Sequence, residues 1–140
     1  MKKEIEKRIK DGWINSWMMI EAMAMTEAVA RNALEKHIKK MENEEGVIVY
    51  EKKFGEAKRI EKPFANIKEA YSQVVELLVL TRNYDKLLYI VMNYAPSAIE
   101  ILEPAEIILK VGEAQAIANS LAALIHKFAA AGAGGIIVSS

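Results

Sequence analysis

Apolar and polar residues interleave along the first forty positions at the spacing of a helix. Ile5 and Ile9 lie four residues apart in the opening segment, which Asp11-Gly12 follows. Because glycine costs roughly 1 kcal/mol in a helix interior, the pattern predicts a short helix that ends there. A second, long helix is expected over residues 14–41, where no proline interrupts the pattern. Acidic residues precede basic ones by four positions in both segments, which favours helix.

The pattern changes to that of strands after Gly46. Residues 47–50 are β-branched or aromatic, and a second run follows Gly55, so a hairpin is predicted over residues 46–61. The second strand of this hairpin is highly charged, as in an edge strand protected from mispairing. Residues 66–82 fit both a helical stripe and a strand alternation, and we expect one turn of helix followed by a long strand.

The C-terminal part of the chain mixes helix and strand patterns. Asn83 is a favourable N-cap for a helix over residues 84–94. Strands are expected over residues 97–102 and 107–111. A final helix is expected over residues 113–130, and its apolar stripe consists of Ala114, Ala118, Leu121, Ile125 and Phe128, widened by Ile117 and Leu124.

These elements predict one α+β domain over residues 1–130, followed by a glycine-rich tail at residues 131–140. We interpret the fold as a ferredoxin-like two-layer sandwich, with a mainly antiparallel sheet and long N-terminal and C-terminal helices. In this interpretation, residues 70–130 form the order strand, helix, strand, strand, helix. A chain of 140 residues is long enough to fold around one core without disulfides.

Composition and charge exclude several classes of protein. Nineteen basic residues balance nineteen acidic ones, which argues against a nucleic-acid partner because that affinity comes from neutralising phosphates. The absence of cysteine excludes disulfides and thiolate chemistry. No apolar run is long enough to span a membrane and no signal-peptide pattern is present, so we expect a cytoplasmic protein without a membrane partner. Abundant Lys and Glu with few Gln are typical of small archaeal proteins from hyperthermophiles.

A short motif lies between the helix over 84–94 and the last helix. The sequence MNYAPSAIEILEPAEI matches a "(Y/F)GP-x-(A/V)-x-VLEP" turn through Tyr94, Pro96, Ala98, Ile101, Leu102, Glu103 and Pro104, with Ala95 where glycine is preferred. Residues 84–128 thereby resemble the C-terminal domain of WYL-type bacterial transcriptional regulators. The resemblance implies a ferredoxin-like regulatory and oligomerising module without catalysis. It does not imply DNA binding, because the chain shows no helix-turn-helix pattern and no WYL core.

Candidate catalytic and metal-binding residues are few. Glu21 and Glu27 stand in or beside a methionine-rich apolar run, where a buried carboxylate could serve as a general base. Six residues apart on a helix, they point in nearly opposite directions and would need other elements to complete each site. His37 is interpreted as a surface residue and His126 as a helix-capping one. Neither forms a metal-binding pair, so no metal and no cofactor is predicted.

Self-association is the simplest explanation for the apolar excess of the predicted helices. The large apolar residues between positions 13 and 25 point all round a helix, whereas packing on one side needs a single stripe. The surplus would form a patch larger than monomers usually expose. We therefore expect a homodimer or higher oligomer whose surface includes Trp13, Trp17, Met19, Met23, Leu124 and Phe128.

The sequence favours a non-enzymatic oligomeric module with a regulatory role, which binds a small molecule or a protein partner. The alternative is a small enzyme with an acidic site at a subunit interface, in which Glu21 or Glu27 acts. A nucleic-acid accessory protein that uses the lysines near His37 is the third hypothesis, and the charge balance counts against it.

Overall fold

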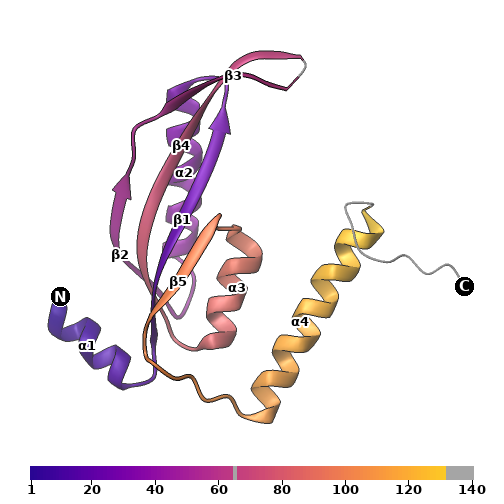
Figure 1. Ribbon diagram of the computed structural model, residues 1–140. Coiled ribbons are helices and arrows are strands. Elements are labelled where there is room, and N and C mark those ends of the chain that lie inside the picture. The colour runs from indigo at the N-terminus through magenta and orange to yellow at the C-terminus, as the bar shows by residue number, and fades with distance from the viewer. Residues whose placement is uncertain (65, 132–140) are drawn as a thin grey trace, which may run out of the picture. The chain divides into compact units, whose positions relative to one another are not determined.

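The computed structural model describes residues 1–64 and 66–131. Within them, the chain has a mixed α+β architecture with four helices and a five-stranded antiparallel sheet (Figure 1). The elements are α1 (Lys2–Lys10), β1 (Ile14–Ala24), α2 (Glu27–Glu42), β2 (Val47–Phe54), β3 (Lys58–Phe64), β4 (Ile67–Thr81), α3 (Tyr84–Tyr94), β5 (Ala98–Glu103) and α4 (Val111–Ala130). The chain divides into two compact units, Met1–Glu106 and Ile107–Ser140, where the sequence predicted one domain.

The sheet is built around the pairing of β1 with β4. The strand order is β2-β4-β1-β5, and β3 also pairs with β4. β1 and β4 are antiparallel along the whole of β1, from Ile14 opposite Thr81 to Ala24 opposite Tyr71. β2 and β3 follow one another along the other edge of β4, and β5 pairs with the free edge of β1.

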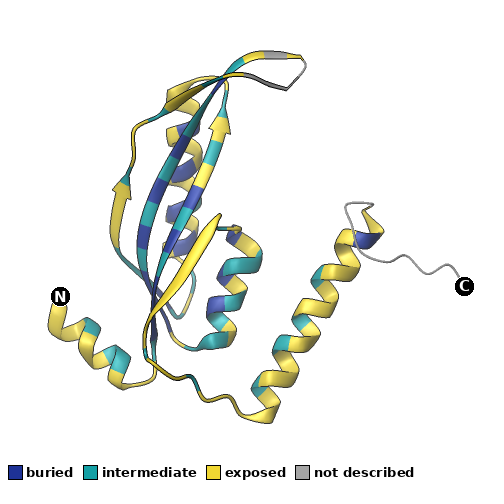
Figure 2. Cartoon of the chain, in the orientation of Figure 1, coloured by how far each residue is buried: buried dark blue, intermediate teal, exposed yellow. Residues whose placement is uncertain are grey.

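One face of the sheet carries the core. Met18 lies opposite Leu77 and Ile20 opposite Val75, and all four side chains are buried. α2 packs against β1, β2 and β4, while α3 contacts both α2 and β4. Figure 2 shows the buried residues concentrated in these helices and the two central strands, whereas β5 is exposed and most of β2 is half-buried or exposed. On the opposite side of the sheet, the alternate residues between Trp17 and Met23 of β1 and between Val74 and Leu78 of β4 are half-buried or exposed.

The helix boundaries follow local capping chemistry. The short N-terminal helix is confirmed, and it ends before Gly12, which has a φ of +98°. The Thr26 hydroxyl accepts a hydrogen bond from the Val29 amide at 3.2 Å at the start of α2. The predicted cap Asn83 is also confirmed, because its side chain accepts from the Lys86 amide at 2.8 Å.

The long helix predicted over residues 14–41 is wrong. Residues 14–24 form β1, and a helix begins only at Glu27. The segment is apolar on every side because β1 is a central strand with neighbours on both edges and apolar residues on both faces. Methionine and alanine favour helices in isolation, but pairing with β4 over eleven residues overrides that preference.

The hairpin predicted over residues 46–61 needs a correction. The chain does turn near Gly55, but β2 and β3 each pair with β4 instead of with one another. The Gly55 amide donates to the Val74 carbonyl at 3.0 Å, and a Cβ at position 55 would lie 2.9 Å from the Val74 side chain. Glycine therefore allows the close approach to β4 at the break between the two strands.

Two further predictions differ from the structure, and two are confirmed. The turn of helix expected at the start of residues 66–82 is absent, because the strand β4 begins at Ile67. Residues 107–111 form no strand, and Val111 begins α4. The helix over 84–94 and the strand following it are confirmed as α3 and β5.

Of the predicted tail at residues 131–140, positions 132–140 lie outside the described residues.

The second unit contains a single helix among its described residues. α4 is 20 residues long, and Ala129 is its only buried residue. Of the described helices, none is both long enough and apolar enough to cross a membrane. α4 therefore carries an apolar surface that its own unit, as far as it is described, leaves exposed (Figure 2).

Candidate functional site

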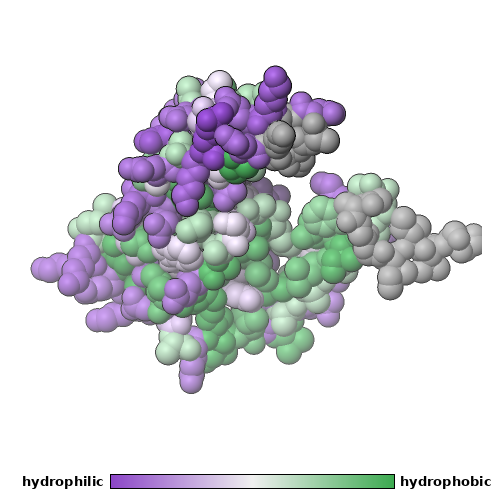
Figure 3. Space-filling view, turned by 45° about the horizontal axis from the view of Figure 1, so that its top comes forward, coloured by the Kyte–Doolittle hydropathy of each residue, from purple (hydrophilic) through white to green (hydrophobic). Residues whose placement is uncertain are grey.

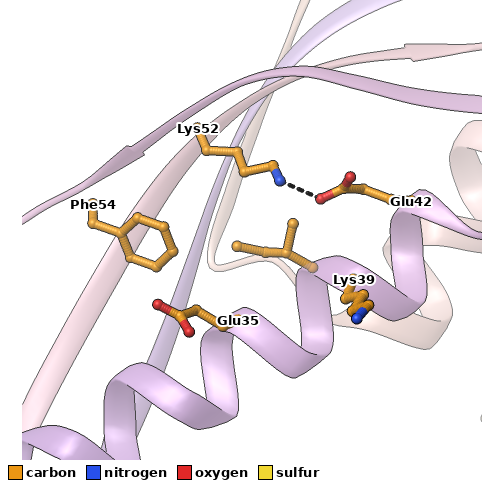
Figure 4. A pocket seen from close by; sticks show the side chains of 6 residues that line it. Glu35, Lys39, Glu42, Lys52 and Phe54 are labelled. Carbon is orange, nitrogen blue, oxygen red and sulfur yellow. Dashed lines mark ion pairs between the residues drawn. The ribbon is translucent and has the colours of Figure 1, made fainter.

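A pocket of about 400 Å³ lies between α2 and β2. Figure 4 shows Lys52 and Phe54 reaching from β2 toward Glu35 and Glu42 on α2. Lys52 forms an ion pair with Glu42. Arg31 donates to Glu35 at 2.9 Å, and its guanidinium stacks 3.8 Å from the centre of the Phe54 ring. Because these charges are already matched within the protein, the pocket offers little unbalanced charge to a ligand.

A polar cluster joins α2 to the end of α3. The His37 Nε2–H donates to the Tyr94 carbonyl at 2.9 Å, and the two rings lie 4.9 Å apart. The Tyr94 hydroxyl donates to Glu44 at 2.9 Å, and the Tyr89 hydroxyl donates to the same carboxylate at 3.3 Å. Burial, reinforced by Glu44, raises the pKa of Tyr94 above its ordinary value. His37 is thus half-buried and engaged in this cluster, not the surface residue that its lysine neighbours suggested.

The two candidate catalytic acids lie on different elements. Glu21 belongs to β1 and, with His37, lines a cavity of about 280 Å³. Glu27 is the first residue of α2. Both are exposed, so the burial that suggested a general base is not found for either residue. In the described part of the chain, no group of three or more His, Asp or Glu side chains is placed to hold a metal ion.

The face of the sheet opposite α2 and α3 brings apolar and acidic side chains together. We call it the open face and define it by Trp17, Met19, Glu21 and Met23 of β1, and by Val74, Glu76 and Leu78 of β4. At its centre, the Trp17 indole N–H donates to Glu76 at 3.0 Å. Trp17, Met19 and Leu78 are half-buried. This face therefore leaves part of a large aromatic and several aliphatic side chains in contact with solvent.

Acidic residues surround the apolar centre of the open face. The register places Glu100 of β5 beside Trp17, and Glu51 of β2 opposite Leu78. With Glu21 and Glu76 they give four carboxylates, and Lys53, opposite Glu76, is the basic residue placed among them. Figure 3 shows hydrophilic surface gathered toward the end of the sheet where β3 lies, with more hydrophobic surface away from that end.

Only some of the predicted association surface forms one patch. Trp17, Met19 and Met23 share the open face, and 44% of Met23 is exposed. Trp13 precedes β1 and is half-buried, with the Arg8 guanidinium 4.5 Å from its ring centre. Leu124 and Phe128 belong to the second unit, where Leu124 is half-buried and Phe128 is 52% exposed.

Sequence reasoning did not place Glu76 in the site. The signal was present, because Glu76 lies two residues from both Val74 and Leu78 and so shares their face of the predicted strand. What was missing was the strand that lies beside it. The hydrogen bond from Trp17 could be inferred only once β1 was known to be a strand paired with β4.

Comparison with known proteins identifies a family. The sequence profile of the MJ0538 family matches residues 15–137. The chain belongs to the MJ0538 family. This match begins in β1 and continues beyond α4, so it includes the sheet except for Ile14. It gives no support to the predicted resemblance of residues 84–128 to WYL-type regulators. Neither a curated protein nor a solved structure matches the chain.

Proposed function

We propose that this MJ0538-family protein is a non-enzymatic, self-associating module that binds a partner through its open face in a regulatory role. The observation that carries the proposal is the Trp17–Glu76 pair, which sets an aromatic side chain among carboxylates on a partly exposed sheet surface. An exposed apolar centre with a polar rim is the usual anatomy of a protein interaction site. The exposure of Glu21 and Glu27 favours a binding module over an enzyme in which one of these residues acts as a general base.

The chemistry of the open face favours a basic, partly apolar protein segment. Trp17 and Met19 provide apolar area, and methionine adapts to partners of varied shape. Glu21, Glu76 and Glu100 would attract lysine or arginine side chains at the rim. The same carboxylates would repel phosphate groups, which argues against nucleic acid as the occupant. An amphipathic helix with one apolar and one basic face meets both requirements.

The topology of the first unit supports a ferredoxin-like interpretation of the fold. Without β3, its elements from β1 onward follow the order β1-α2-β2-β4-α3-β5, with the sheet order β2-β4-β1-β5. This is a strand-helix-strand repeated twice in one antiparallel sheet, with both helices toward the face of Met18 and Leu77. We treat β3 as an addition along the free part of β4.

Fluorescence of Trp17 tests the proposed binding face directly. The probe is a peptide of about 18 residues, five helical turns, with leucine on one face and lysine on the other. The protein carries Trp13→Phe so that Trp17 is the remaining tryptophan. We expect saturable quenching or a spectral shift with the basic peptide. A peptide of the same pattern with glutamate in place of lysine should not bind.

Removal of one charge provides a matched comparison. Glu76→Gln keeps an oxygen for the Trp17 indole but removes the carboxylate charge, and it should weaken binding about two- to fivefold, as expected for a partly exposed ion pair. Glu6→Gln in α1 removes an exposed charge away from the open face and should leave the affinity unchanged. Equal binding of the acidic peptide, or no response to either peptide, would overturn the proposal.

A further inference from the structure

α4 carries an exposed seam with the spacing of a coiled coil. Its members are separated alternately by three and four residues, and every one of them is exposed. They are Val111, Ala114, Ala118, Leu121, Ile125 and Phe128. This spacing is the a/d pattern of a heptad repeat, which holds one line of side chains facing a partner helix. Leu121 is 42% exposed, Ile125 58% and Phe128 52%, so the seam presents large apolar side chains to solvent.

A second stripe on α4 is distinct from this seam. Glu113, Ile117, Ser120 and Leu124 are half-buried, and each lies beside the seam rather than on it. The seam differs from this stripe in that all six of its residues are exposed, so the described residues do not cover it. Figure 2 shows that most of α4 is exposed, with half-buried residues interspersed along it.

We propose that the seam of α4 pairs with the same seam of a second copy, in antiparallel orientation. This inference rests on the proposed self-association and deepens it by naming the surface that is responsible. The six seam residues are symmetric about a point between Asn119 and Ser120. An antiparallel pair centred there would place Phe128 opposite Val111, Ile125 opposite Ala114, and Leu121 opposite Ala118 of the partner copy.

The sizes of the side chains select this orientation. In each antiparallel layer a large residue meets a smaller one, so the three layers fill similar volumes. A parallel pair would stack Phe128 on Phe128 at one end and Ala114 on Ala114 at the other. If the two helices of a parallel pair were spaced to fit the phenylalanines at one end, voids would remain between the alanines at the other end. Such voids lose packing contacts.

The positions that flank the seam are compatible with the pairing. Gln115, Ile117, Ala122, Leu124 and Ala129 stand there, and none carries a charge. Like-charge repulsion is thus avoided, and Ile117 and Leu124 would widen the apolar contact along one side. The helix is about 30 Å long at 1.5 Å per residue. A contact of this length is small, of the kind found in reversible dimers.

The mass of the full-length protein in solution tests the surface. Sedimentation equilibrium between about 1 and 200 μM should show a dimer of twice the 15.7 kDa chain. Ala118→Glu places a charge in the seam and should weaken dimerisation at least tenfold. Ala123→Glu makes the same change on the outer side of the helix and should leave the dimer intact. Because glutamate is a good helix former, circular dichroism should show unchanged helix content in both variants.

Single cysteines test the orientation, since the chain contains none of its own. Ala114→Cys alone should not form a disulfide-linked dimer, because antiparallel pairing separates the two sites by eleven residues, about 16 Å. A mixture of Ala114→Cys and Ile125→Cys copies should cross-link under mild oxidation. Rapid cross-linking of Ala114→Cys alone would overturn the antiparallel arrangement.

The outcomes separate this inference from the proposed function. A wild-type protein that stays monomeric at every concentration would overturn the seam pairing and the proposed self-association together, but not peptide binding by the open face. A dimer that survives Ala118→Glu would overturn the seam and leave self-association standing through another surface. A monomeric Ala118→Glu beside a dimeric Ala123→Glu supports the inference.

Discussion

Tyr94 connects the two helices that cover the sheet. Its side chain is 3% exposed, and its hydroxyl reaches the Glu44 carboxylate just beyond α2. Its carbonyl accepts the hydrogen bond from His37 within α2. One residue thereby fixes the end of α3 against two points of the preceding helical segment, which makes it a sensitive place to perturb.

Tyr94→Phe should lower the free energy of unfolding by about 1–2 kcal/mol. The substitution keeps the ring but removes a partly buried hydrogen bond to a charged group, and such bonds carry net free energies of this size. Urea unfolding monitored by circular dichroism measures the change. Tyr89→Phe is the control, because Tyr89 is 39% exposed and its hydroxyl lies farther from Glu44, at 3.3 Å. An equal loss in both variants would contradict the special role of Tyr94.

The same residue predicts how stability depends on alkaline pH. Burial and the hydrogen bond to Glu44 raise the pKa of Tyr94 above its ordinary value of 10.0. The folded state therefore holds the phenol proton at a pH where the unfolded chain releases it. The stability linked to this group is complete below pH 10 and is lost as the pH rises toward the folded pKa. Melting temperatures between pH 8 and pH 11 should fall less steeply in Tyr94→Phe than in the wild-type protein.

Single-residue environments were predictable only where they are local. The Asn83 cap involves a partner three residues away, and sequence spacing found it. His37 bonds to the carbonyl of Tyr94, which is 57 positions away in the sequence, and Trp17 bonds to Glu76, which is 59 positions away. The lysines beside His37 indicated exposure because local sequence does not show which element packs on that side of a helix.

At the scale of elements, the backbone at the end of α3 is strained, and a single substitution should relieve this strain. Ala95 is its C-cap and adopts the left-handed conformation, with φ of +47° and ψ of +58°. Among the residues that the structure describes, Ala95 is the one non-glycine residue with a positive φ. Glycine is the usual residue at such a position because it has no Cβ to clash with the backbone.

Ala95→Gly should stabilise the protein by about 0.5–1 kcal/mol. The relief of the left-handed strain should exceed the extra chain entropy that glycine brings to the unfolded state. Urea unfolding again measures it. Asn43→Gly is the comparison at the C-cap of α2, where φ is −85° and glycine relieves nothing. A loss of stability in Ala95→Gly would show that the methyl group of Ala95, at the cavity lined by His37, contributes more through packing than it costs in strain.

The elements differ in how well sequence predicted them, and the reason is the range of the contacts that stabilise them. The predicted helices α1, α3 and α4 were confirmed, because each carries a helical pattern within its own residues, and α3 also has the predicted cap. β1 was mistaken for a helix because its buried and half-buried faces are both apolar, and methionine-rich segments show no clear alternation. β3 was paired with the wrong strand, since charge on an edge strand does not reveal its neighbour.

Across the whole molecule, α4 and not the N-terminal segment carries the unexplained apolar surface. The apolar excess between residues 13 and 25 suggested an exposed helix surface. As β1, the segment buries Ile14, Met18 and Ile20 on one face and contributes Trp17 and Met19 to the open face. The apolar residues of α4 have no comparable explanation within the described chain, because Ala129 alone is buried there.

The distribution of buried residues predicts that the first unit folds without the second. Apart from Ala129, every buried apolar residue in the described chain lies within residues 1–106. A fragment of residues 1–106 should therefore unfold cooperatively, with a free energy of unfolding within about 1 kcal/mol of the full chain, since regions with separate cores contribute additively. Urea unfolding of both proteins makes the comparison.

A shorter fragment controls for the loss of a strand that the core needs. Residues 1–97 lack β5, which pairs with β1 along one edge of the sheet. This fragment should be markedly less stable, because it leaves the backbone groups of β1 without partners beside the buried core. The fragment of residues 1–106 should also sediment as a monomer wherever the full chain is a dimer, because it lacks α4. A 1–106 fragment that is unfolded would show that the second unit completes the core; a folded but dimeric one would place self-association on the first unit.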